Sequence, residues 1–215
     1  DDEVVGFSLT GDIEIEPVVA QGCRSVGPLF EVVQSEGNAV KMVTEEGKDE
    51  KVPPMAALRK VLQSLEPKDV ELAQTALLIG VARDDFSDEL GAGDYLIRQV
   101  VGVSVKDGSL IFGDSVRPGK RFRFHVRDRE AAVQEAEALF SGYKRKRLME
   151  MMSGKKSADA SGCLMFACTG RGRGLYNEPN FDSRLAYLST GVPVTGLFCN
   201  GEVGPVGGGT HLHGF

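Results

Sequence analysis

The sequence of 215 residues has no tryptophan, three histidines, four cysteines and no long uninterrupted apolar run. A membrane-spanning helix needs about 20 consecutive apolar residues, whereas the apolar stretches here have strand length and are broken by glycine. No Cys-x-x-Cys pair occurs, so a common signature of zinc and redox sites is missing. Cys163, Cys168 and Cys199 lie in apolar segments, where a thiol usually packs as a small hydrophobic side chain. We therefore expect reduced thiols, with structural disulfides as the alternative.

Positive charge is also in short supply. The net charge is −6 and the pI is near 5.2, which argues against nucleic acid as a partner, because phosphate binding needs a basic face. The sequence shows no initiator methionine and no signal-like segment, so both ends are interpreted as cuts in a longer polypeptide. We expect an intracellular, cytoplasmic protein without a membrane span. An organelle such as a plastid stays open, because a targeting segment upstream of Asp1 would not be seen.

Hydrophobic periodicity predicts both strands and helices. Residues 54–65 place apolar side chains at helical spacing behind Pro54, and Asp128 is a favourable N-cap for a helix that runs to residue 152. Together with the strands, these helices favour an α/β fold of the α+β kind, with a mixed, largely antiparallel sheet covered by amphipathic helices. The expected strands are residues 4–19, 29–34, 39–43, 75–82, 96–105, 109–116, 121–126, 163–170 and 194–200, with a meander over 96–126 and a short helix near 182–188.

A glycine-rich basic loop, Gly170-Arg171-Gly172-Arg173-Gly174, directly follows one expected strand. Residues without side chains let backbone amides approach an anion, and two guanidinium groups can bind a carboxylate or phosphate through paired hydrogen bonds. The loop lacks the spacing of a P-loop or of a dinucleotide-binding fingerprint. It is a candidate ligand-facing loop, and a mobile surface turn is the alternative.

A second candidate region begins with Cys199-Asn200-Gly201-Glu202 at the end of another expected strand and continues into a stretch rich in glycine and proline. Such an ending often forms the mouth of a site, although a turn that merely closes the sheet fits equally well. Glu202 can accept a hydrogen bond from an amino group, and Asn200 can both donate and accept. Cys199 would be a nucleophile only beside a base, which the sequence does not place.

His211 and His213 stand two residues apart near the end of the chain. On a strand they would share a face, and with Cys199 or Glu202 they would suit a zinc site. This spacing is weak evidence by itself, so we assign no metal and treat both histidines as packing or ligand-contact residues.

The tail, residues 197–215, reads LFCNGEVGPVGGGTHLHGF. It resembles the end of the C-terminal domain of the FIST family (F-box and intracellular signal transduction proteins), typically a stretch like FFCNGEIGPVGG followed by a Leu-His-Gly-Phe element. Residues 163–176 resemble the family's strand that ends in a Gly-Arg-Gly turn, and residues 115–128 resemble its strand that leads into a long helix. Residues 21–28 resemble the junction between its two domains. Thr169 departs from the pattern, which has asparagine there.

The resemblance implies a sensory module that binds a small ligand and is not an enzyme, with no cofactor. Residues 1–50 would be the end of a FIST N-terminal-type domain, and residues 51–215 a C-terminal-type domain truncated at its end. Arginine and carboxylate side chains together would suit an amino-acid-like ligand. The alternative is a protein–protein adaptor, for example the substrate-recruiting part of an F-box ubiquitin ligase or a subunit of a larger assembly. The expected ligand-binding residues are Arg171, Arg173, Cys199, Asn200, Glu202 and His211.

Overall fold

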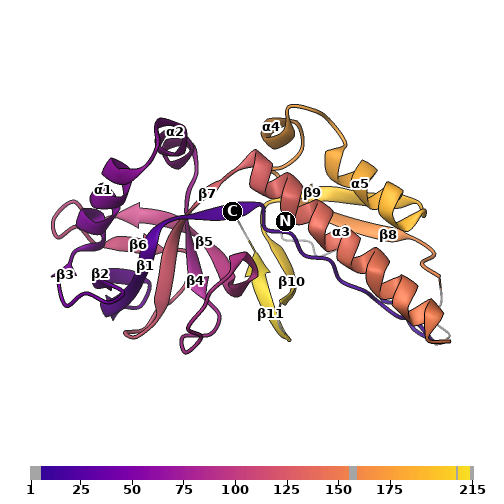
Figure 1. Ribbon diagram of the computed structural model, residues 1–215, viewed down its shortest axis with the longest axis horizontal. Coiled ribbons are helices and arrows are strands. Elements are labelled where there is room, and N and C mark those ends of the chain that lie inside the picture. Colours follow the sequence, from indigo (N-terminus) through magenta and orange to yellow (C-terminus); the bar gives the residue numbers. More distant parts are fainter. Residues whose placement is uncertain (1–5, 155–158, 207, 214–215) are drawn as a thin grey trace.

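The computed structural model describes residues 6–154, 159–206 and 208–213. Figure 1 shows two parts side by side: an antiparallel sheet with two helices at one end, and a layer of two parallel strands with a long and a shorter helix. This is the predicted class, a mixed and largely antiparallel α+β fold. The helices are α1 (Pro54–Ser64), α2 (Pro67–Thr75), the 3-10 helix η1 (Ala92–Asp94), α3 (Arg129–Met152), α4 (Arg173–Tyr176) and α5 (Phe181–Thr190).

The antiparallel sheet closes on itself. Its strands are β1 (Cys23–Glu36), β2 (Ala39–Glu45), β3 (Lys51–Val52), β4 (Leu77–Ala82), β5 (Tyr95–Val103), β6 (Leu110–Phe112) and β7 (Arg121–Arg127). In the described residues, six of them pair in the order β1-β7-β4-β5-β6-β2, and β2 pairs back with β1 to complete a ring. The long β1 takes part at both ends of this order because residues 23–31 pair with β7 and residues 30–36 pair with β2. Its register to β7 shifts between Val26 and Phe30, a stretch that contains Gly27 with a φ of 72°.

The interior of the closed sheet is an aromatic core, formed by alternate residues of its strands. Neighbouring rings lie 5.3 to 5.7 Å apart, mostly edge to face. Helix α1 covers one opening and buries Val61 against the backbone of β1, since a Cβ atom on Gly27 would lie 2.8 Å from this side chain. The rings of the core are Phe30, Phe112, Phe122 and Phe124.

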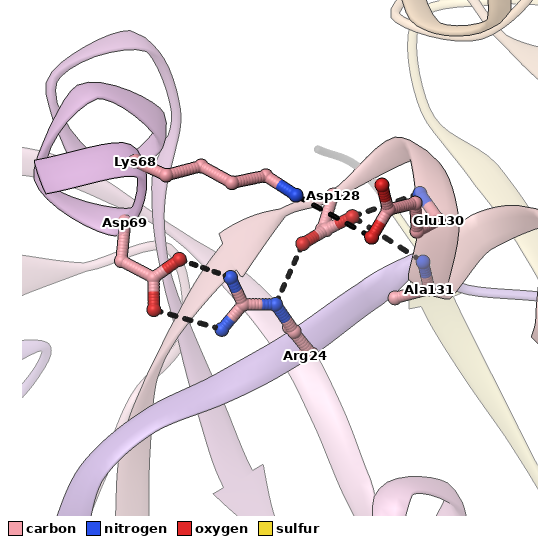
Figure 2. Close-up of polar contacts among 6 residues, drawn as sticks. All are labelled: Arg24, Lys68, Asp69, Asp128, Glu130 and Ala131. Carbon is pink, nitrogen blue, oxygen red and sulfur yellow. Dashed lines mark hydrogen bonds and ion pairs between the residues drawn. The ribbon is translucent and has the colours of Figure 1, made fainter. Parts of the chain in front are cut away.

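Asp128 joins the closed sheet to α3, and Figure 2 shows its contacts. One carboxylate oxygen accepts from the N–H groups of Glu130 and Ala131 at 2.8 and 3.3 Å, which caps the helix as predicted. The other accepts from Arg24 of β1 at 2.6 Å. Arg24 also forms an ion pair with Asp69 of α2, so a single guanidinium connects three elements.

The second part is built around two parallel strands, β8 (Cys163–Cys168) and β9 (Val194–Cys199), joined through α4 and α5. Helix α5 packs against both strands, and α3 packs against α5. The hairpin of β10 (Glu202–Val206) and β11 (Gly209–His213) follows. The side chain of Arg98 in β5 donates to the carbonyl of Leu212 at 3.0 Å, which connects this hairpin to the closed sheet.

The strand expected over residues 4–19 is wrong in its described part, because residues 6–22 contain no strand. Residues 4 and 5 lie outside the described residues. The segment runs beside α3 instead: Glu16 pairs with Lys146, and the N–H of Gly22 donates to Glu135. A helix offers no open edge for pairing, so apolar alternation alone does not make this segment a strand.

The meander expected over residues 96–126 is also wrong in part. Strands β5 and β6 pair as neighbours, but β7 lies between β1 and β4. Such pairings join strands far apart in the sequence, and local turn signals do not specify them. Strands β1 and β2 pair with β7 and β6, so the sheet contains residues from both sides of the expected domain boundary after residue 50.

Candidate functional site

The carboxyl ends of β8 and β9 lie side by side. The strands are parallel and pair Cys168 with Cys199, and the N–H of Thr169 donates to the carbonyl of Cys199 at 2.8 Å. The glycine-rich loop after β8 and the Asn200-Gly201 turn after β9 therefore stand at one edge. Ligands commonly bind at this edge of parallel strands. The structure thus brings together the two loops that the sequence singles out.

Arg171 of the glycine-rich loop is engaged within the protein. Its Nε and Nη2 donate to the two carboxylate oxygens of Asp182 at 3.0 and 2.9 Å, and Nη2 also donates to the hydroxyl of Tyr176. That hydroxyl donates to Asp182 at 2.9 Å. Burial acts to lower the pKa of Arg171, but hydrogen bonding and the charge of Asp182 outweigh it and raise the pKa above its ordinary value. This ion pair holds the loop against the start of α5.

Arg127, at the end of β7, lies across the same loop. A Cβ atom on Gly170 would lie 1.4 Å from Arg127 Nη1, so a larger residue there would displace the guanidinium from this position. Arg127 Nη2 also donates to the thiol of Cys168 at 3.9 Å. Arg127 is not among the expected site residues. The sequence feature that could have marked Arg127 as a site residue is its position directly before Asp128, in the segment that resembles the family's strand before the long helix.

Glu202 begins β10, and its carboxyl is close enough to Arg127 and Arg171 for their charges to affect its pKa. Its Oε1 is shielded from solvent and has no hydrogen-bond partner within the described chain. Burial raises the pKa of this carboxyl, opposed by the N–H of Gly201 and by the charges of Arg127 and Arg171. The edge of β8 and β9 is therefore a region of closely spaced, partly buried charges.

The other expected ligand-binding residues are arranged around this edge in different environments. The side chains of Arg173 and Asn200 are exposed. Cys199 is half-buried, with its thiol 3.9 Å from the carbonyl of Leu197. His211 is half-buried on β11, directly opposite Gly204 of β10.

His213 is the more buried of the two histidines in the tail. Its Nε2 lies 3.3 Å from the carbonyl oxygen of Gly204, and burial lowers its pKa. Over the part of the chain that the structure describes, no group of three His, Cys, Asp or Glu side chains is placed to hold a metal ion. The zinc arrangement considered for Cys199, Glu202 and the histidines therefore has no geometric support there.

An open cavity of about 180 Å³ lies on the face of β8 and β9 that α5 covers. Apolar side chains, including Met165, Ala167 and Phe198, form its walls. Asn180, Asp182 and other polar residues from the start of α5 form its rim. The six expected ligand-binding residues do not line it, but Arg171 reaches it indirectly through its ion pair with Asp182. The complete lining is Met165, Ala167, Gly172, Asn180, Phe181, Asp182, Ser183, Val194, Thr195, Gly196, Leu197 and Phe198.

Comparison with known proteins assigns the family. Residues 54–205 match the FIST C domain, a region that contains both loops and the whole cavity lining. The chain belongs to the FIST family. Membership indicates a domain of the sensory, signal-transduction type. The FIST match leaves residues 1–50 outside its range, so their assignment to an N-terminal-type domain stays a prediction.

This FIST chain is also similar to bacterial proteins of about twice its length. An uncharacterized protein of Mycobacterium bovis and two of Mycobacterium tuberculosis are each 33% identical to it over 213 residues. Each match covers 99% of this chain and 51% of the relative, so the chain spans about half the length of these relatives. No solved structure matches the chain. Among the described residues, no helix is both long and apolar enough to cross a membrane.

Proposed function

We propose that this FIST domain is a non-enzymatic sensing module that binds a small ligand in the cavity between α5 and the β8–β9 pair. The observation that carries the proposal is the combination of apolar walls and a polar rim in one open cavity. Small-molecule sites typically have this composition, with a few polar groups that orient the ligand. The location next to the carboxyl ends of parallel strands supports the same proposal.

The lining suits an amino-acid-like ligand. Asn180 offers an oxygen to an ammonium group, and Asp182 keeps an unused acceptor position on Oδ2 beside its bond from Arg171. Met165 and Phe198 offer an apolar surface to a side chain. Arg173, Cys199, Asn200, Glu202 and His211 remain candidates for contacts with the polar end of a ligand that extends to the edge of the strands. In this proposal Arg171 acts indirectly, because it fixes the position of Asp182.

A second cavity, of about 210 Å³, lies between α1 and the strands β1 to β3, but its rim suits a ligand less well. Its charged residues already pair with one another: Lys48 with Glu45 at 2.7 Å, and Lys60 with Glu50 at 3.1 Å. A ligand there would have to displace these exposed pairs. We therefore place the ligand at the β8–β9 cavity.

Ligand binding can be tested by thermal unfolding of the chain with individual amino acids and small carboxylates. A ligand at about 100 times its Kd stabilises the folded state by roughly 2.7 kcal/mol, which raises Tm by about 5–10 °C for a chain of this size. Phe198→Ala should abolish the shift, because Phe198 lines the cavity. Phe166→Ala is the matched control, since both rings are 59% exposed but Phe166 is not part of the lining. The proposal fails if no compound raises Tm, or if the two variants lose the shift equally.

An adaptor role is the second candidate function, and one observation favours it: large apolar side chains are exposed on β8 and β9. Such a surface commonly marks a protein–protein contact. The F-box and ubiquitin-ligase role stays a prediction, as does an intracellular location.

A further inference from the structure

In the part of the chain that the structure describes, the face of the β8–β9 pair opposite the cavity is bare. Side chains alternate along a strand, so Leu164 and Phe166 of β8 point to the face opposite Met165 and Ala167. They are 51 and 59% exposed, respectively. Sheets with parallel strands are normally covered on both faces, and a two-stranded sheet alone is only marginally stable. This face therefore has the composition of a sheet interior but lacks its cover.

The edges of the pair are open as well. Within the described residues, β8 and β9 form a sheet of their own and pair with no other strand. The unpaired N–H and C=O groups of an outer edge can accept an added strand. The bare face and the open edges belong to the same two strands, so one docked segment could satisfy both.

This exposure is not a general property of the chain. The closed sheet buries the rings of its core almost completely, since Phe112, Phe122 and Phe124 are each no more than 1% exposed, although Val101 and Val103 of β5 are 55 and 47% exposed. The apolar exposure of the second part extends from the two strands to neighbouring helices, with Leu188 of α5 65% exposed and Met152 of α3 78% exposed. The uncovered surface is thus concentrated in one of the two parts.

The length of the relatives indicates what covers this surface. Each match takes in 99% of this chain but 51% of the relative, so the relatives carry nearly as much polypeptide again. We propose that the bare face defined by Leu164 and Phe166, together with the adjacent strand edges, is the surface on which that additional half docks. The docked half supplies an apolar face and at least one strand that extends the β8–β9 sheet. Each relative carries one such additional half for each region that matches this chain. One docked half for one bare face fits this ratio better than the pairing of two copies of this chain through their bare faces.

The test adds the non-matching half of a Mycobacterium tuberculosis relative to the chain, as a separate polypeptide that circular dichroism and a cooperative thermal transition show to be folded. Mass is measured by light scattering after size exclusion, and backbone amide exchange is measured on residues 163–168 and 194–199. A one-to-one complex in which these amides become protected is the expected result. Self-association of the chain through the same strands would overturn the proposal in favour of a second copy. A chain that stays monomeric, with no protection when the other half is added, would overturn it altogether.

The same change, Phe→Glu, at two exposed positions tests whether the bare face itself forms the contact. Phe166→Glu places a charge on the bare face and should weaken the complex roughly tenfold or more, given the apolar area of a phenyl ring. Phe86→Glu is the control, because Phe86 is 92% exposed in a loop of the closed sheet. Both positions are exposed, so both variants should fold, and circular dichroism checks this. Equal affinities for the two variants would place the contact elsewhere. Neither substitution touches the cavity lining, so failure of docking is separable from failure of ligand binding.

Discussion

Replacing Asp128 with alanine removes two kinds of interaction from one carboxylate. The first is the N-cap of α3, whose loss typically costs about 1 kcal/mol. The second is the charge-assisted hydrogen bond from Arg24 at 2.6 Å, and bonds to charged groups contribute about 1.5–3 kcal/mol. The lower end applies, because the Arg24 side chain is 34% exposed and keeps its pair with Asp69. The expected loss is about 2–3 kcal/mol, or roughly 4–12 °C in Tm.

Urea unfolding of Asp128→Ala beside Asp128→Asn separates the two contributions. Asparagine caps a helix about as well as aspartate but carries no charge, so Asp128→Asn should lose about half as much stability. If the asparagine variant is as unstable as the alanine variant, the cap contributes nothing. If both are as stable as the parent chain, the connection drawn in Figure 2 does not stabilise the fold.

The pH dependence provides an independent check on the same carboxylate. Burial acts to raise the pKa of Asp128, but hydrogen bonds from Arg24, Ala131 and Glu130 lower it by more. The folded pKa therefore lies below the unfolded value of about 3.9. Its contribution to stability is complete above that value and is lost as the pH falls through the folded pKa. Asp128→Asn should not show this part of the acid-induced loss.

Two further predictions concern buried charged or titratable groups. His125 is 2% exposed and its ring packs against Gly80, so burial lowers its pKa to about 4. The free energy of unfolding should therefore fall by up to about 3 kcal/mol as the pH drops from about 6.5 towards 4. Urea titrations across this pH range should show that His125→Asn loses this part of the pH dependence. Asp182→Ala leaves the guanidinium of Arg171 buried without its carboxylate and should cost about 3–5 kcal/mol. Arg184→Ala, which breaks an exposed pair between Arg184 of α5 and Glu178 of the preceding loop, should cost less than about 1 kcal/mol. Similar losses for the two variants would contradict the structural role assigned to the pair of Arg171 and Asp182.

Local signals in the sequence predicted the elements whose causes are local. Pro54 at the first turn and Asp128 at the N-cap marked the two main helices. The expected strands 29–34 and 39–43 are parts of β1 and β2, which Gly37-Asn38 connects. Helix α2 was not predicted, because it is short and carries few apolar residues, although Pro67 at its first position was an available signal. Closure of the sheet depends on β7 reaching β1 across about a hundred residues, and no local pattern encodes that pairing.

In the candidate site, too, the features with local causes were predicted and those that depend on the path of the chain were not. The sequence placed two loops after two strands, and parallel pairing of β8 and β9 brings those loops together. The ion pair between Arg171 and Asp182 was not predicted, because it forms only when the chain turns through α4 into α5 and brings the two side chains together. In the sequence, Arg171 between glycines suggests the binding of an external anion, but in the structure its partner is the carboxylate of Asp182.

The alternation of side chains along β8 and β9 separates the two proposed activities. Met165 and Phe198 face the cavity under α5, and Leu164 and Phe166 face the bare side. Ligand and docked polypeptide would therefore meet the same strands without contacting each other. A ligand that holds the two strands in their paired geometry also holds the opposite face in the geometry that docking requires. Thermodynamic linkage makes such an effect reciprocal, since docking must then raise ligand affinity by the same factor. A two-stranded sheet with one face for each partner is thus a physically sufficient element for passing a binding signal between the two halves of a longer protein.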